Sequence, residues 1–367
     1  TLGAQKHAGT SKHMRGTALI YSSHNRSNHI HNDLIVQRAL EGRDNKRILF
    51  LPMSETVQNG SEMERQEFSW GTFRWFFDYY RKFGLEYFPF YWTSGLRKQD
   101  VDQLWHHIWS SEVVILGGGH SRTGMERYRE LGARFEGNGE KMASLLHERQ
   151  QNGKLTVGFS AGADQLCEYM LSSAFRQMHD PRGFGLARNV MVTLHHESSN
   201  NDDLWKMSQR FPQCMVFGLP NDSGINVDQG WLPSGNSWQV IDFVLDQSWD
   251  LPRDHWHVKT RWGEKIQHIG PDGRHWAFNH GDKMVRVQSR DSRFHEAWLI
   301  LGGRMVHYWT QQPSRYGSVT ELLAQLPGPQ GPDTGRPVFA YEMQVALPVA
   351  GIGGDEHPAF PVEQFGT

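Results

Sequence analysis

The chain has little cysteine and no long hydrophobic run. Among its 367 residues there are two cysteines, Cys167 and Cys214. That number excludes a disulfide-stabilised scaffold, because domains held together by disulfides are dense in cysteine. We expect both cysteines to be buried free thiols. The longest apolar runs, such as Ile48–Pro52 and Val113–Leu116, have the length of strands. They fall far short of the ~20 residues that a membrane-spanning helix needs.

The chain also lacks an excess of charge of either sign. The 38 Lys and Arg residues almost balance the 40 Asp and Glu residues, and the net charge is −2. A protein that coats nucleic acid or an anionic membrane normally has a basic excess, so we expect neither partner. With 38% hydrophobic and 21% charged residues, the chain has the composition of a folded globular protein. What is plentiful is Gly (38), His (20) and Trp (14).

The first 15 residues are polar and contain no apolar core of a signal peptide. We expect residues 1–15 to be a flexible segment and the protein to be cytoplasmic. The chain begins with Thr1 instead of Met, which leaves open the removal of a leader.

Short apolar segments alternate with longer segments of helical spacing over residues 16–246. This alternation predicts a doubly wound, mostly parallel α/β sheet with helices on both faces. The expected strands are Ala18–Ser22, Arg47–Met53, Leu85–Trp92, Val113–Gly117, Leu155–Ser160, Met191–His195 and Cys214–Leu219. The expected helices are Asp33–Glu41, Glu62–Phe83, Asp100–Ser110, Gly124–Phe135, Glu140–Gln150 and Asp202–Phe211.

Residues 247–367 have a different character and predict a β-rich C-terminal extension. One short helix is expected at Ser318–Leu326, a Pro/Gly linker at 327–337, and a last strand at Phe339–Leu347. We expect the tryptophans of this region to pack the extension onto the main sheet; a glycan-binding face is the alternative. The strands expected from Ser237 onward, with hairpin-type turns between them, are Ser237–Leu245, His255–Arg261, Lys265–Ile269, Trp276–His280, Val285–Gln288 and Ala297–Trp309.

Ligands of such sheets bind beyond the carboxyl ends of the strands, and there the chain carries a Ser between two glycines. Gly158-Phe-Ser160-Ala-Gly162 follows an apolar strand and precedes a helical run, which is the layout of a nucleophile elbow. A serine on so sharp a turn needs small residues two positions away on either side. Ser160 is therefore the candidate nucleophile.

Three further strand ends carry polar or glycine-rich segments. Gly117-Gly118-Gly119 follows one strand, and its backbone N–H groups could form an oxyanion hole with that of Ala161. No nucleotide-binding fingerprint accompanies these glycines, and we expect no cofactor. His195 ends another strand and is a candidate general base. Asn221 and Asp222 follow the last strand, and the acid could orient the histidine.

Gly158-Phe-Ser-Ala-Gly-Ala163, downstream of the three glycines, resembles peptidase family S51, which contains dipeptidase E and cyanophycinase. The resemblance covers about residues 16–246 and favours the dipeptidase E branch. It implies a fold like that of class I glutamine amidotransferases (flavodoxin-like) with a Ser nucleophile. It also implies Ser160 as nucleophile, His195 as base, and an oxyanion hole of Ala161 with Gly118 or Gly119.

The chain departs from the family pattern at the third catalytic position. Relatives carry Gly-Leu-Pro-Glu, and the ungapped match places Asn221 at the Glu. We favour Asp222 over Asn221 as the residue that orients His195, which requires a backbone shift of one residue. His196 stands where the family usually has Phe, and the extension after residue 246 is absent from dipeptidase E.

The function predicted is hydrolysis of short peptides, or of Asp-linked (iso)peptides, through an acyl-enzyme. Two alternatives stay open. One is a non-catalytic binding protein with a degraded triad; the other is an α/β-hydrolase-type esterase, which would need a late histidine such as His280 or His295. The predicted partner is a small peptide substrate. The aromatic run Phe68–Tyr80 is expected to pack in the core, and a substrate cleft or a homodimer interface are the alternatives for it. The paired histidines His29 and His31, His106 and His107, and His255 and His257 have no zinc-binding framework around them, and we expect no metal.

Overall fold

The computed structural model describes residues 16–23, 28–55, 73–171, 180–232, 234–246, 263–292, 294–325 and 336–337. The segments predicted at 1–15, His255–Arg261 and Phe339–Leu347 lie outside these residues, as does most of the predicted linker 327–337. No helix of the described part is long and apolar enough to span a membrane.

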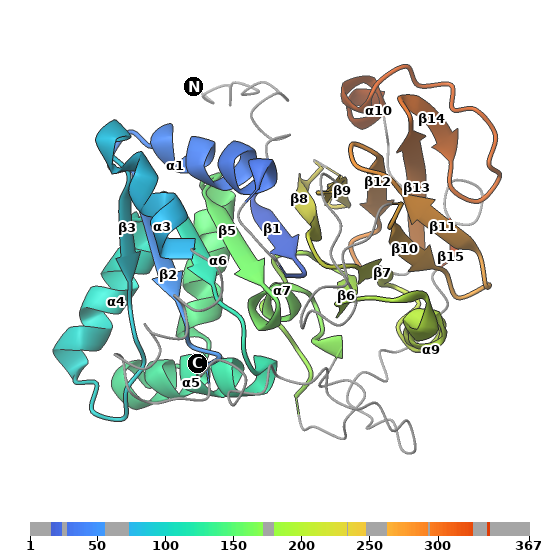
Figure 1. Ribbon diagram of the computed structural model, residues 1–367. Coiled ribbons are helices and arrows are strands. Elements are labelled where there is room, and N and C mark those ends of the chain that lie inside the picture. Colours follow the sequence, from blue (N-terminus) through green and yellow to red (C-terminus); the bar gives the residue numbers. More distant parts are fainter. Residues whose placement is uncertain are drawn as a thin grey trace, which may run out of the picture.

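One half of the main sheet is parallel (Figure 1). Its inner strands are short apolar runs buried on both faces, which is typical of a parallel sheet covered by helices. Neighbours pair in parallel throughout this half. The order is β3 (Glu86–Pro89), β2 (Arg47–Leu51), β4 (Val113–Leu116), β5 (Leu155–Phe159) and β1 (Ala18–Tyr21).

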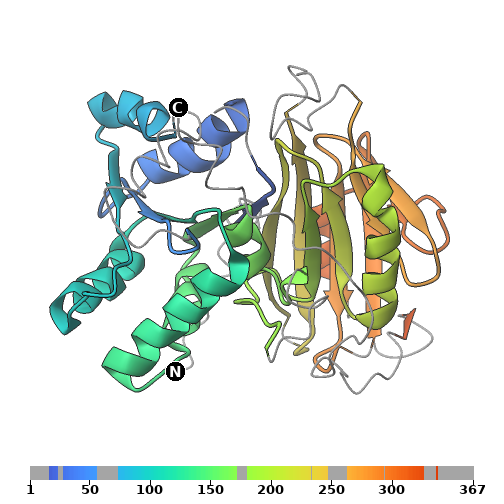
Figure 2. The ribbon, with the colours of Figure 1, turned by 60° about the horizontal axis from the view of Figure 1, so that its bottom comes forward.

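Helices cover both faces of the parallel half (Figure 2), and alternate strand residues explain why. Leu19, Ile48 and Val113 point into one apolar cluster, whereas Ala18 and Val114 point into the other. The first cluster is closed by η1 (His31–Val36), α1 (Gln37–Leu40), α3 (Phe73–Asp78) and η2 (Tyr79–Phe83). The second is closed by α4 (Lys98–Ser110), α5 (Ser121–Glu136) and α6 (Lys141–Gln151). The predicted doubly wound fold is confirmed.

The main sheet continues beyond β1 as an antiparallel half that includes several strands of the C-terminal extension. β8 pairs with β1, and each following strand is antiparallel to its neighbour. β8 was not predicted, since Gly224, Asp228 and Gly230 interrupt its apolar pattern. The strands are β8 (Ser223–Trp231), β9 (Ser237–Leu245), β12 (Lys283–Gln288), β13 (Phe294–Leu301), β14 (Arg304–His307) and β15 (Arg336–Pro337), which pairs with β13.

Two strands that the sequence pattern grouped with the others lie in a second sheet. β6 and β7 are parallel to each other, and β10 of the extension pairs with β7. This sheet packs on the antiparallel half through Phe217, Phe243 and Phe278, the last two stacked at 3.9 Å between ring centroids. The strands are β6 (Val190–Leu194), β7 (Met215–Leu219), β10 (Ile266–Ile269) and β11 (His275–Phe278).

Two more helices cover the outer faces of this β-rich part. α9 (Asn201–Arg210) packs on the second sheet through Leu204 and Met207, and α10 (Val319–Gln325) packs on the end of the main sheet. Trp298 is buried there. Trp276 and Trp309 pack on the main core, and the other predicted packing tryptophans, Trp249, Trp256 and Trp262, lie outside the described residues.

Cys167 and Cys214 are buried free thiols, as predicted. Burial raises the pKa of both well above its usual value.

Removal of residues 247–367 should leave an aggregating protein. It deletes the strands paired with β9 and β7 and uncovers the Phe217 and Phe243 rings, so that two sheet edges and apolar core become exposed. Size-exclusion chromatography of the purified protein measures this. A variant that lacks only residues 338–367 is the control, and a soluble, monomeric 1–246 fragment would contradict the prediction.

His268 should make the fold sensitive to acid. Its ring bridges Val216 O (2.9 Å) and the Tyr308 hydroxyl (2.7 Å), and burial lowers its pKa to about 4. Between pH 6.5 and 4 the unfolded chain binds the proton and the folded protein does not, so stability falls as the pH falls. The loss should reach about 3 kcal/mol.

Urea unfolding at pH 7 and pH 4.5 tests this against His268→Gln, which removes the titration and should show a smaller loss. His106→Gln, at an exposed position of α4, is the control. An equal pH dependence in all three proteins would rule out the role of His268.

Candidate active site

Ser160 lies on a strained turn between β5 and α7 (Ala161–Leu166). Its backbone has φ 50° and ψ −114°, a conformation that non-glycine residues rarely adopt. A Cβ on Gly158 would overlap the carbonyl of Gly162, and a Cβ on Gly162 would overlap that of Leu116. Both glycines of the predicted elbow are therefore required by close backbone approach.

The three-glycine segment after β4 lies beside this turn. A Cβ placed on Gly118 would be 3.4 Å from Ser160 Cβ, so the two residues face each other. The N–H of Gly117 donates to Leu51 O (3.0 Å), and that of His120 donates to Ser54 O (2.7 Å). These two bonds fix the segment on either side of Gly118 and Gly119. The structure thus brings both glycines and Ala161 to the nucleophile turn.

His195 and Asn221 complete a chain of contacts from Ser160. Ser160 Oγ is 3.3 Å from His195 Nε2, and His195 Nδ1 is 2.6 Å from Asn221 Oδ1. All three side chains are buried. Since an amide oxygen only accepts, Nδ1 carries the hydrogen and Nε2 is left as an acceptor towards the serine hydroxyl.

The contact to Asn221 corrects the preference for Asp222. No backbone shift moves Asp222 into the place of Asn221, because Asp222 is fixed in its own position. Its N–H donates to Ser23 O (2.6 Å), its carbonyl accepts from Asp246 N–H (2.8 Å), and its φ is 55°. The ungapped match was the better guide to the geometry.

His196, the second departure, holds the segment that follows β6. Its Nδ1 is 2.7 Å from Thr193 Oγ1, and its Nε2 is 2.8 Å from Asn201 Oδ1 at the start of α9. An apolar Phe could make neither bond. Here His196 links the end of β6 to α9.

The end of β1 contacts all three polar strand ends of the site. The Ser160 N–H donates to Tyr21 O (3.1 Å), and the His195 N–H donates to Ser22 Oγ (2.8 Å). With the bond from Asp222 to Ser23, the last residue of β1 and the two residues that follow it hold three residues whose φ is positive. Sequence reasoning missed Ser22 and Ser23, although their place directly after a strand was a usable signal.

Tyr21 is a buried phenol at the same edge. Burial raises its pKa well above the usual value, and the charge of Asp222 raises it further. Asn28 Nδ2 donates to the Tyr21 hydroxyl oxygen (3.2 Å), and this hydrogen bond lowers the pKa of Tyr21. Tyr21 is consequently neutral over the physiological range and packs edge-on to Phe159.

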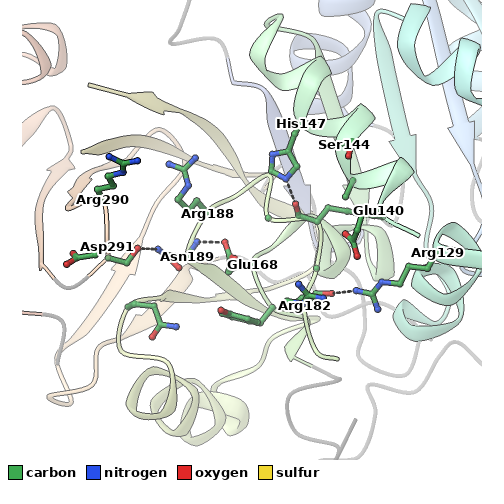
Figure 3. Close-up of a pocket in the computed structure, with 17 residues that line it drawn as sticks. Arg129, Glu140, Ser144, His147, Glu168, Arg182, Arg188, Asn189, Arg290 and Asp291 are labelled. Atoms are coloured by element: carbon green, nitrogen blue, oxygen red, sulfur yellow. Dashed lines mark hydrogen bonds between the residues drawn. The ribbon is translucent and has the colours of Figure 1, made fainter. Parts of the chain in front are cut away.

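A cavity of about 700 Å³ lies away from Ser160, between α5, α6 and the turn after β12 (Figure 3). Two of the arginines that line it are paired with a carboxylate. Asp180, at its edge, bridges Arg129 (3.3 Å) and Arg182 (2.9 Å), and Glu168 accepts from the Asn189 N–H (3.1 Å). These bonds stabilise the wall of the cavity.

A second cavity, of about 860 Å³, lies at the opposite end of the parallel strands, where Thr17 and Lys154 precede β1 and β5. Burial raises the pKa of its Asp228 to about 7. Neither cavity contains a residue of the elbow. Among the described residues, no three His, Cys, Asp or Glu side chains are arranged to hold a metal ion.

A model of peptidase family S51 matches residues 18–232. Proteins described as Peptidase E, from Salmonella arizonae and Salmonella gallinarum, are 26% and 25% identical over 134 residues, which is 34% of this chain. The matches cover 55% and 53% of those relatives, so the chain spans about half of their length. A solved structure of a peptidase from an acI-B1 Actinobacterium covers 74% of this chain and 97% of its own, with TM-score 0.48 and 13% identity.

Gly162→Ala should distort the nucleophile turn. The added methyl overlaps the carbonyl of Leu116, whose strand is paired on both sides, and overpacking of this kind costs about 1 to 3 kcal/mol. Thermal unfolding measures the loss. Gly139→Ala is the control, since its nearest neighbour would be the Arg129 carbonyl at 3.7 Å. Equal stability of the two variants would contradict this account of the turn.

Proposed function

Because the chain belongs to peptidase family S51, we propose that it is a serine peptidase that hydrolyses short peptides through an acyl-enzyme on Ser160. The observation that carries the proposal is the contact chain from Ser160 Oγ through His195 to Asn221. In the neutral ring, this arrangement presents the hydroxyl to a ring nitrogen that can accept its proton, which is what activation of a serine requires.

In the first half-reaction, Ser160 Oγ attacks the peptide carbonyl carbon while His195 Nε2 accepts the hydroxyl proton. The negative charge that develops on the carbonyl oxygen is stabilised by the backbone N–H groups of Ala161 and of Gly118 or Gly119. The tetrahedral intermediate then collapses. The C–N bond breaks, His195 gives its proton to the leaving amine, and an ester on Ser160 remains.

In the second half-reaction, water replaces the amine. His195 Nε2 takes a proton from the water molecule, whose oxygen attacks the ester carbonyl. Collapse of the second intermediate returns the proton to Ser160 Oγ and releases the carboxylic acid. Atoms and charges balance without a metal or a cofactor.

Asn221 fixes the ring of His195 without neutralising its charge. The amide oxygen holds the Nδ1–H tautomer, so that Nε2 is the base. When the imidazolium forms, an amide stabilises it less than a carboxylate would, and we expect turnover to be slower than with an acid at this position. The substrates proposed are short peptides, including those with an N-terminal or isopeptide-linked Asp.

The neutral third member also favours a second candidate, a binding protein that has kept the fold and lost turnover. The esterase alternative has less support, because the histidine beside Ser160 is His195 and not His280 or His295. Reaction with a fluorophosphonate separates the two candidates, since it requires an activated serine and no particular peptide.

Ser160→Ala and His195→Ala should each lower peptide hydrolysis by at least about 1,000-fold. The two losses should not add in the double variant, because nucleophile and base act as one unit. Release of free amine from a library of short peptides is the measurement, and Ser208→Ala, a buried serine on α9, is the control. Full turnover in either single variant would refute the mechanism.

Asn221→Asp should shift the pH dependence of kcat/KM. A carboxylate on Nδ1 stabilises the imidazolium, so the acidic limb should move to higher pH, whereas Asn221→Ala should lower kcat by about 10- to 100-fold. The comparison uses pH–rate profiles of both variants and the wild type. An unchanged acidic limb in Asn221→Asp, with the variant folded, would contradict the assignment of Asn221.

A further inference from the structure

Ser22 is a fully buried residue directly after β1, and its side chain belongs to the support of His195. Its Oγ accepts the hydrogen bond of the His195 backbone N–H at 2.8 Å. Its own N–H donates to Ser223 O at 2.9 Å, in the chain just past Asn221. Ser22 therefore lies between the candidate base and the turn that orients it.

The backbone of His195 needs an outside partner. With φ 51°, His195 is in the left-handed region, which is sterically unfavourable for a residue with a side chain. It follows the last residue of β6 and is buried, so its N–H would be costly to leave without an acceptor. The hydroxyl of Ser22 supplies that acceptor.

The two neighbouring hydrogen bonds use main-chain acceptors instead of a side chain. The N–H groups of Ser160 and Asp222 donate to the main-chain carbonyls of Tyr21 and Ser23, which no substitution removes. Of these three bonds from the end of β1, the one to His195 alone depends on a side chain. It can be deleted without moving the strand.

We propose that Ser22 is a positioning residue for the reaction at Ser160. Its hydroxyl holds the backbone of His195 so that Nε2 faces Ser160 Oγ while Nδ1 stays on Asn221. The role rests on the proposed function and acts on the rate of the chemical step, not on substrate affinity, because Ser22 contacts the base through its backbone. Loss of the bond lets the ring move from its 3.3 Å contact with the nucleophile.

The test compares Ser22→Ala with Ser22→Thr, which keeps an Oγ. The probe is a fluorophosphonate, and the readout is the second-order rate constant for labelling Ser160, followed by kcat and KM on a cleaved peptide. Ser22→Ala should label about 10- to 100-fold more slowly and lose the same factor in kcat with KM within about twofold. Ser22→Thr should recover most of the rate. Ser22→Cys keeps a side chain but offers only a weak acceptor, so it should resemble Ser22→Ala, and it replaces Ser22→Ala if the loss of the side chain prevents folding.

Ser111→Ala is the matched control. Ser111 is equally buried, but it lies before β4, at the opposite end of the parallel strands. Both alanine variants are compared at a temperature at which circular dichroism shows them folded. Labelling of Ser22→Ala within twofold of the wild type overturns the proposal, as does an equal loss in Ser111→Ala.

Failure of the proposed function gives a different result. In that case the fluorophosphonate does not label Ser160 of the wild type. The proposal is then tested by the NMR resonance of the imidazole N–H of His195 in histidine-labelled protein. This resonance is assigned by its absence in His195→Ala. A resonance that shifts or exchanges faster in Ser22→Ala, and not in Ser111→Ala, supports the positioning role. An unchanged resonance overturns it.

Discussion

The carboxyl end of β1 is the constraint on which the candidate site depends. β1 pairs in parallel with β5 on one side and antiparallel with β8 on the other, so the parallel and antiparallel halves of the main sheet meet at this strand. Tyr21, Ser22 and Ser23 accept from Ser160, His195 and Asp222 in turn. Each of those three residues has a positive φ, and each bond compensates part of the steric cost of that backbone.

The C-terminal extension supports the same site from the other side. His195 and Asn221 follow β6 and β7, which belong to the second sheet, and β10 of the extension pairs with β7. Arg286 of β12 is buried, and burial lowers its pKa to about 10. Its guanidinium donates to Asn189 O and Gln213 O, just before β6 and β7. Residues outside the matched family region therefore fix the starts of both strands that lead to the candidate base and its contact, Asn221.

Much of this arrangement could be predicted from local sequence. The turn at Ser160 could be predicted because the strand, the glycine spacing and the helix lie within one short segment. His195 could be predicted because ligands of such sheets bind beyond the carboxyl ends of the strands. The separation of β6 and β7 into a second sheet could not be predicted, because buried strands of both sheets have the same apolar pattern. Ser22 was missed for a related reason: its role comes from a contact between residues 173 positions apart.

The choice between Asn221 and Asp222 shows where electrostatic reasoning alone was misleading. A carboxylate was favoured because it stabilises an imidazolium, but position in a tight turn is set by backbone bonds, and those of Asp222 lead to Ser23 and Asp246. The acid is nevertheless close to the site, since its charge contributes to the raised pKa of Tyr21. The proposed mechanism thus divides between two neighbours the functions that one acid usually combines. In it, Asn221 selects the tautomer of His195 by contact, whereas the charge of Asp222 would act on the imidazolium through space, an effect that weakens with distance.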